Sequence, residues 1–388
     1  MVEALKRVGE TARLSAILIG TVVGAGFVSG AELVRFFPTE NFLPCAFLAA
    51  LLIFLGFALL FYCGKKYGGF EGTLCRVFKN FAPAVRWIVL AASLMTSAGM
   101  LAGLDSVMLE GFGVPKSVPL LSLGVLIAVY FLSEKGTAAI GWVNLCLVPA
   151  ILVFVASLAF RRVDFSYAFY PAREPFAAVC LVIAYAGMNV FLAAPVVCDL
   201  GAKYGGGTVA AAGASLVIGA SIVIILANIF AAGANAIGAD MPLLAVMGAQ
   251  SVMGKIFAIV SAFGIVTTLF SSWYSLHARA KRCRHARSAR VLLCAAAFLL
   301  SRFGLKNIVG FAYPLLGLCG IFFLGACALK CFFPKKNSPM HSAKGRERIS
   351  SAIRAERHLG CLMTIFSAST TRKYMPAARM QSINVAAI

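Results

Sequence analysis

The sequence predicts an all-α polytopic membrane protein, with about ten transmembrane helices in a five-plus-five inverted repeat whose helices 1 and 6 are broken. Of the 388 residues, 61% are hydrophobic and only 13% are charged, and the mean hydropathy is +0.91. This composition excludes an ordinary soluble domain. The other two observations are a series of apolar runs of membrane-spanning length, and polar or helix-breaking residues near the middle of the first and sixth runs.

A helix that crosses the hydrocarbon core of a bilayer needs about 20 mainly apolar residues. The expected spans, of which the fourth and ninth are short, are 14–37, 43–64, 87–111, 118–133, 138–160, 176–199, 208–235, 254–278, 290–304 and 308–333. The two halves, 14–160 and 176–333, have similar lengths. Because each half holds an odd number of spans, the halves insert in opposite senses, as an inverted repeat requires.

The net charge of +21 is spread over the segments between the spans and the C-terminal tail. We interpret these basic residues as topology signals rather than a nucleic-acid site, because Lys and Arg are enriched in cytoplasmic loops. The protein is therefore expected in the cell (inner or plasma) membrane as a multi-pass protein. Its N-terminus, residues 1–13, and its C-terminus are both expected to be cytoplasmic. Anionic lipids are the expected partners of basic loops such as 279–290. Residues 334–388 are expected to form a basic, disordered tail.

The first span, LSAILIGTVVGAGFVSGAELVRFF, contains Gly20, Gly24, Gly26 and Gly30. Each glycine costs a helix about 1 kcal/mol relative to alanine, and free backbone groups at membrane depth are tolerated only where they line a protected site. The span is therefore predicted to be a broken helix at a transport site. The alternative is that the glycines, in two small-xxx-small patterns, let two helices approach closely.

Glu32 lies six residues beyond Gly26, or about 9 Å of helical rise, inside a hydrocarbon half-thickness of about 15 Å. An acidic side chain at that depth is a candidate for function. The alternatives are an ion pair with Arg35, one turn further on, or a side chain that reaches the outer surface.

The sixth span carries Tyr185, Gly187, Asn189 and Pro195 in or near its middle. In an inverted repeat this is where a second break is expected. The alternative is a proline kink without a ligand, because Pro and Gly are common in membrane helices. Residues 236–253, which follow the seventh span, are expected to form an external segment that covers the site, or an ordinary loop.

Two broken helices expose carbonyl groups at one break and N–H groups at the other, so they can hold a cation and a polar or anionic group. The carbonyls of Gly20 and Val23 are candidates for binding an alkali ion, and the N–H groups of residues 26–29 are candidates for binding a substrate carboxylate or another polar head group. Span eight supplies further oxygen ligands at helical spacing, namely Gly264, Thr267 or Thr268, Ser271 and Ser275. The alternative is that these hydroxyls bond only carbonyls of their own helix.

The segment IGTVVGAGFVSGAELVRFF resembles the opening signature of the YkvI-like family of bacterial membrane proteins. That family belongs to the amino acid-polyamine-organocation superfamily, with the LeuT-type five-plus-five inverted repeat. The resemblance covers residues 10–333. It implies a sodium site with Gly20 and Val23 as backbone ligands and Gly264, Thr267 and Thr268 as partners.

The resemblance also implies a substrate site at the two breaks. Together with the polar residues of the two spans, the expected substrate-binding residues are Gly24, Ala25, Gly26, Phe27, Ser29, Glu32, Tyr185, Gly187 and Asn189. Phe27 stands where amino-acid symporters with a second sodium ion carry asparagine. The resemblance therefore supports neither a second sodium site nor an amino-acid substrate.

We expect a secondary active transporter, sodium- or proton-coupled, that moves a small polar or amphipathic solute by alternating access. The alternative is a non-transporting sensor or scaffold that retains the fold and signals through its basic tail. An enzyme is not expected, because the sequence has no HExxH or GxSxG motif and only four histidines. No cofactor is expected besides a coupling sodium ion. The twelve cysteines form no CxxC pair, which argues against a zinc site. The sequence does not predict the oligomeric state.

Overall fold

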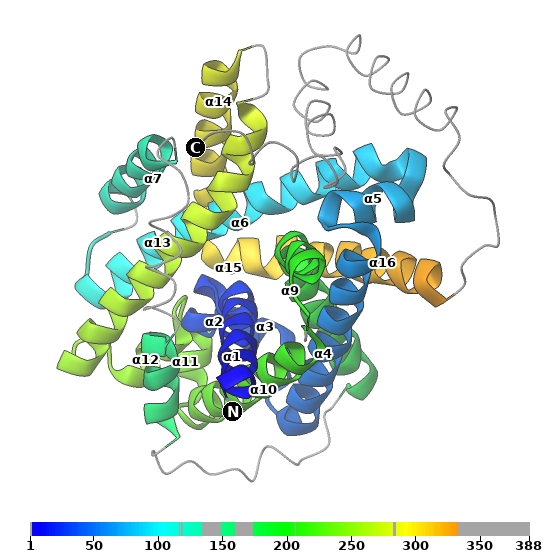
Figure 1. Ribbon diagram of the computed structural model, residues 1–388. Coiled ribbons are helices and arrows are strands. Elements are labelled where there is room, and N and C mark those ends of the chain that lie inside the picture. The colour runs from blue at the N-terminus through cyan, green and yellow to red at the C-terminus, as the bar shows by residue number, and fades with distance from the viewer. Residues whose placement is uncertain are drawn as a thin grey trace, which may run out of the picture.

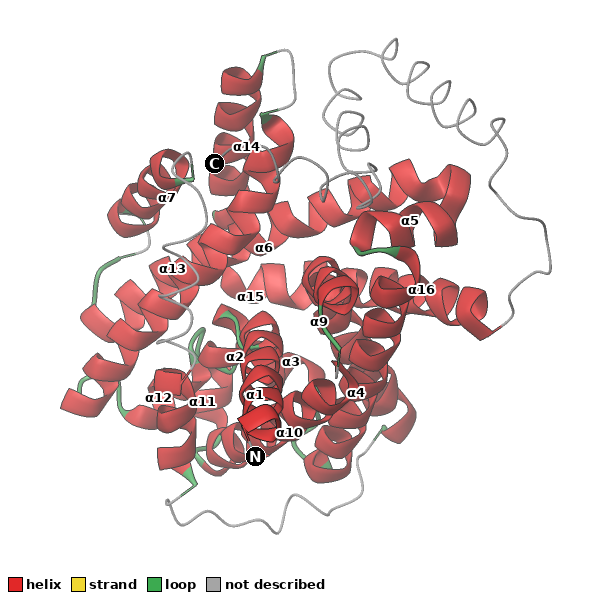
Figure 2. Cartoon of the chain, in the orientation of Figure 1, coloured by secondary structure: helices red, strands yellow, loops and turns green. Residues whose placement is uncertain are grey.

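The computed structural model describes residues 2–115, 117, 119–133, 149–159, 174–205, 207–281 and 285–332. Helices joined by short loops make up these residues, and none of them forms a strand (Figure 2). The labelled helices are α1 (Val2–Val22), α2 (Ala25–Ser29), α3 (Ala31–Phe36), α4 (Phe42–Tyr67), α5 (Phe70–Phe78), α6 (Ala82–Phe112), α7 (Leu120–Leu132), α9 (Pro175–Lys203), α10 (Gly207–Ala231), α11 (Ala234–Gly238), α12 (Pro242–Met247), α13 (Val252–Ala280), α14 (Ala286–Ser301), α15 (Leu305–Asn307) and α16 (Tyr313–Phe332). A 3-10 turn, η1 (Lys79–Phe81), precedes α6, and a π-helical turn, η3 (Ile308–Ala312), precedes α16.

Six helical segments of the described residues are long and apolar enough to cross a membrane. They are Phe42–Tyr67, Phe70–Phe112, Pro175–Lys203, Gly207–Ala231, Val252–Phe270 and Leu305–Phe332. Two shorter apolar helices are Leu120–Leu132 and Pro149–Leu158. The protein is therefore helical and polytopic, whereas the ten-span count and the inverted repeat stay predictions. The tail, 334–388, lies outside the described residues, as does part of the basic segment 279–290.

The predicted boundary between a cytoplasmic N-terminus, 1–13, and the first span lies inside a continuous helix. Helix α1 begins at Val2 and ends at Val22. The segment before the first span is thus an extension of the same helix, with charged residues on its first turns.

The long helices pack as two groups (Figure 1). In the first group, α4 packs along α9 and α10, α1 packs along α10 and α9, and α16 packs along α9. In the second group, α13 and α14 pack on α6, and α7 contacts all three. Helices that correspond to predicted spans 1, 2, 6 and 7 therefore share one group, and those of spans 3, 4, 8 and 9 share the other.

The interruption expected in the first span is present at its middle. Helix α1 ends at Val22, and α2 begins at Ala25. Gly24 is extended (φ −101°, ψ −170°), and its N–H donates to the carbonyl of Val22 at 2.8 Å. Gly30 (φ +81°) then joins α2 to α3 in the left-handed region that favours glycine.

The prediction of a break in the sixth span is wrong for this structure, because α9 is one continuous helix from Pro175 to Lys203. Gly187 serves a close helix approach instead. A β-carbon at Gly187 would lie 2.8 Å from the carbonyl oxygen of Gly317, and one at Gly320 would overlap the carbonyl of Gly187. Small residues that let two membrane helices meet are the alternative use of glycine in such a span.

Candidate functional site

A cavity of about 490 Å³ lies between the two helix groups. Its walls come mainly from α1, α6, α9 and α13, with residues of α3, α5, α16 and the helix Pro149–Leu158 completing it. A cavity of this size and largely apolar lining is typical of a site for a small organic ligand.

The interruption of the first span presents backbone carbonyls at this cavity. The N–H of Val23 donates to Ile19 O at 2.8 Å, and the N–H of Val28 donates to Gly24 O at 2.9 Å. Among the described residues, no backbone N–H donates to the carbonyl of Gly20 or Val23, and both residues line the cavity. Carbonyl oxygens at such a break are ligands for an alkali cation.

Helix α13 brings two hydroxyl groups to the same place. The Oγ1 atoms of Thr267 and Thr268 each donate to Gly264 O at 3.0 Å. On the sequence alone, such bonds to carbonyls of the same helix are the alternative to binding a cation. A hydroxyl that donates one hydrogen bond keeps its oxygen lone pairs for a cation, so the two uses are compatible. A β-carbon at Gly24 would lie 3.6 Å from Thr268 Cγ2, which places α13 against the break.

Eight of the fourteen predicted site residues line the cavity. They are Gly20, Val23, Gly24, Glu32, Asn189, Gly264, Thr267 and Thr268. The predicted residues Gly26, Phe27, Ser29, Tyr185 and Gly187 are not part of its lining. The side chain of Ala25 and those of Ser271 and Ser275 lie outside the described part of the chain.

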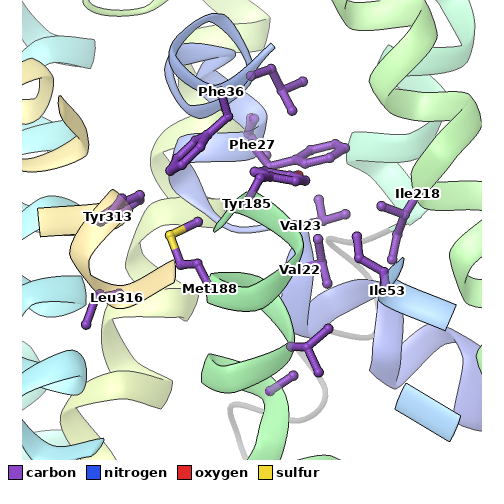
Figure 3. Packing of buried hydrophobic residues seen from close by; sticks show 14 of the residues in the cluster. Val22, Val23, Phe27, Phe36, Ile53, Tyr185, Met188, Ile218, Tyr313 and Leu316 are labelled. Atoms are coloured by element: carbon purple, nitrogen blue, oxygen red, sulfur yellow. The ribbon is translucent and has the colours of Figure 1, made fainter. Parts of the chain in front are cut away.

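Two of the residues away from the cavity form the aromatic packing behind it (Figure 3). Phe27 and Tyr185 are fully buried. The ring of Tyr185 packs against Phe36 and Phe37, with centroids 5.7 and 5.2 Å apart. These rings hold α9 against α3, so they support the wall of the cavity from behind.

Ser29 also has a structural role at the interruption. Its Oγ donates to Gly26 O at 3.0 Å and accepts the N–H of Ala31 at 3.1 Å. The hydroxyl therefore joins the end of α2 to the start of α3, where two short helices leave backbone groups without helical partners. Asn189 does reach the cavity, and its Nδ2 donates to Tyr185 O at 3.0 Å.

Glu32 is 6% exposed and lines the cavity from the first turn of α3. The ion pair with Arg35 that the sequence offered as an alternative is not formed, because the Arg35 guanidinium donates to Gly310 O at 3.2 Å. Within the described residues, the Glu32 carboxyl group has neither an ion pair nor a hydrogen bond.

Sequence reasoning missed several residues of the cavity wall. Ser93, Thr96 and Met100 form one stripe of α6 that faces it, and their spacing of three and four residues is a signal that the sequence does contain. Tyr313 and Met188 also line it. Tyr313 carried no such signal, because its position depends on the π-helical turn η3 just before it.

Comparison with known proteins finds one curated relative. The chain is similar to the uncharacterized membrane protein YkvI of Bacillus subtilis (strain 168), with 24% identity over 341 residues, which cover 83% of this chain and 96% of that protein. This similarity confirms the resemblance to YkvI-like proteins carried by the first span. No family model matches the chain.

Solved structures with some similarity to the chain include two transporters. One is Mhp1, a nucleobase-cation-symport-1 family transporter in a closed conformation with bromovinylhydantoin bound, with a TM-score of 0.48 and 14% identity, covering 92% of this chain and 88% of that one. The other is a mutant of the manganese transporter of Eremococcus coleocola, with a TM-score of 0.46 and 12% identity, covering 92% and 94%. The names of these similar proteins describe a membrane protein and two transporters.

Proposed function

We propose that this protein is a secondary active transporter that moves a small polar or amphipathic solute by alternating access, coupled to sodium. One observation carries the proposal. Gly20 and Val23, whose carbonyls accept no N–H among the described residues, line the same cavity as Thr267 and Thr268. A hard cation prefers such oxygen ligands, and an interrupted membrane helix is tolerated where it lines a site of this kind.

The packing of the helices supports a mechanism. The cavity lies between two groups of helices that pack mainly within themselves. Movement of one group relative to the other changes which end of the cavity is open, and does so without unfolding either group. As a co-transported ion, sodium lowers the free energy of the conformations in which Gly20, Val23 and α13 stay together.

The test is thermal unfolding of the purified full-length protein in sodium, lithium and potassium chloride at one pH. A ligand that binds only the folded state, at about 100 times its Kd, adds about 2.7 kcal/mol to the apparent stability. We expect selective stabilisation by sodium in the wild type and none in Thr267→Val plus Thr268→Val, because valine keeps the shape of threonine and removes the hydroxyl.

Thr96→Val is the matched control. Thr96 also lines the cavity, and its hydroxyl donates to Ala92 O of its own helix at 2.9 Å, but it lies on α6 and is not one of the proposed sodium ligands. The sodium effect should persist in this variant. A wild type that responds equally to all three salts contradicts sodium coupling. A stabilisation that depends on pH and disappears in Glu32→Gln points to protons as the coupling ion instead.

The alternative of a sensor or scaffold depends on residues 334–388, which the structure does not describe. No observation on the described residues favours it. Removal of 334–388 separates the two functions, because a transporter keeps its solute flux without the tail and a tail-based sensor loses its output.

A further inference from the structure

Glu32 is the acidic side chain of the cavity lining, and the fold holds it there. Its side chain lies across α2, where a β-carbon at Gly26 would overlap the carboxyl group. Only 6% of Glu32 is exposed, and no described residue forms an ion pair or hydrogen bond with it. A buried carboxylate is costly unless a cation or a hydrogen-bond donor joins it.

The rest of the lining is suited to an organic cation. No Lys, Arg or His belongs to the cavity lining among the residues that the structure describes. Three aromatic residues, Phe70, Phe191 and Tyr313, do belong to it. Aromatic faces attract ammonium groups and also bind apolar carbon. The other polar groups of the lining, among the described residues, are hydroxyl groups, the Asn189 amide and backbone groups, none of which carries a charge.

We propose that the transported solute is a small amphipathic organic cation, whose ammonium group binds the Glu32 carboxylate and whose apolar part lies against the aromatic lining. This inference rests on the proposed function and deepens it by naming the substrate class. The volume of about 490 Å³ admits such a molecule, and it is far larger than a bare metal ion needs. An anionic solute is disfavoured because the Glu32 carboxylate repels a like charge.

The test compares three probes of similar size with the purified full-length protein at one pH. Phenethylammonium is the cation, 2-phenylethanol is its neutral analogue and 3-phenylpropanoate is the anion, and isothermal titration calorimetry measures each Kd. We expect the ammonium to bind about tenfold or more tightly than the other two, because a hydrogen bond to a charged partner in a buried site is worth about 1.5–3 kcal/mol.

Glu32→Gln removes the charge and keeps the size of the side chain. It should weaken phenethylammonium binding about tenfold or more and leave 2-phenylethanol binding unchanged. Glu32→Asp keeps the charge and should keep the preference for the cation. Glu174→Gln is the control, since Glu174 is exposed just before α9, and it should bind all three probes as the wild type does.

Equal affinity of the wild type for the three probes overturns the proposal, and that result does not depend on whether any variant folds. Equal ammonium affinity of the wild type and Glu32→Gln also overturns it. Binding of Mn²⁺ that needs Glu32, without ammonium binding, overturns it in favour of a divalent cation.

Sodium stabilisation separates this proposal from the proposed function, because it depends on Thr267 and Thr268 and should persist in Glu32→Gln. A normal sodium effect without cation preference overturns the substrate class alone. Absence of the sodium effect in the wild type overturns the coupling, whatever the probes show.

Discussion

At Gly26 the lack of a side chain lets the Glu32 carboxyl group lie against α2. The overlap that a β-carbon would create involves the Glu32 Oε1, Cδ and Cγ atoms, and these atoms form the flexible end of that side chain. The helices therefore need not move to relieve the overlap. The carboxyl group has to move instead, and it is the only acidic group of the cavity lining among the described residues.

We predict that Gly26→Ala weakens phenethylammonium binding about tenfold, because displacement of a catalytic or binding group by about 1 Å has large effects. The free energy of unfolding should change by less than about 2 kcal/mol, because alanine favours a helix more than glycine does. Calorimetry and thermal unfolding measure the two quantities. Gly9→Ala is the control, since Gly9 is an exposed position of α1 with open space around it. Unaltered ammonium affinity in Gly26→Ala would show that the position of Glu32 does not matter.

The sequence was sufficient to predict Glu32 and Asn189 as cavity residues, because a polar side chain at mid-membrane depth is rare enough to be informative. It was also sufficient for the interruption at Gly24, since four glycines are clustered there. It could not separate Gly26 from Gly24. One of them lines the cavity and the other makes room for a side chain six residues on, and that difference depends on side-chain directions that spacing alone does not specify.

Helices α9 and α16 approach each other through glycine on both sides. Gly187 faces the Gly317 carbonyl, Gly317 faces Ala184, and Gly320 faces Gly187. Close approach of this kind maximises van der Waals contact between membrane helices. It also fixes the position of Tyr313, at the start of α16, relative to Asn189 on α9, and both residues line the cavity.

Gly187→Ala should therefore destabilise the protein by about 1–3 kcal/mol, because the added methyl group meets backbone and overpacking costs about that much. Thermal unfolding in one detergent measures the change. The matched control is Gly325→Ala on α16, where a β-carbon meets no atom within 4 Å, and its stability should equal or exceed that of the wild type. A Gly187→Ala protein that is as stable as the wild type yet loses solute binding would restore the predicted substrate role of Gly187.

The sixth span was misread for a physical reason. A glycine that ends a helix and a glycine that packs against a second helix look the same within one span. The residues that decide between them, Gly317 and Gly320, lie about 130 positions further along the chain. The first span was read correctly because its interruption is local: Gly24 is extended and Gly30 has φ +81°.

Polar contacts join both ends of α6 to other elements. The cavity extends along the middle of this helix, from Val89 to Met100, and before it Arg86 forms an ion pair with Glu71 of α5 at 3.0 Å. Beyond it, α6 is tied to other elements by polar contacts. Asp105 forms an ion pair with Arg302 at the end of α14, and Ser106 Oγ bonds Asp240 Oδ2 at 3.1 Å.

Further contacts join the same end of α6 to the short helices α11 and α12. The Glu110 carboxylate accepts the N–H groups of Asp240 and Met241 at 2.7 and 3.1 Å. Lys306 Nζ lies 3.5 Å from Asp240 Oδ1. The segment 236–253, for which the sequence suggested a cover or an ordinary loop, is thus bonded to this end of α6 through Asp240 and Met241. Under the proposed alternating access, we expect these contacts to break and re-form.

Glu110 is suited to a test of this attachment, because its carboxylate accepts two backbone N–H groups of the loop between α11 and α12. We predict that Glu110→Ala speeds amide hydrogen exchange in residues 234–247 about tenfold. Local opening sets the exchange rate, and each lost hydrogen bond to a charged group makes opening easier by about 1.5–3 kcal/mol. Hydrogen-exchange mass spectrometry measures it, with Glu174→Ala as the control. Exchange in α16 should stay at the wild-type rate. If 234–247 exchanges no faster in Glu110→Ala, or if α16 speeds up equally, Glu110 does not act by holding this segment in place.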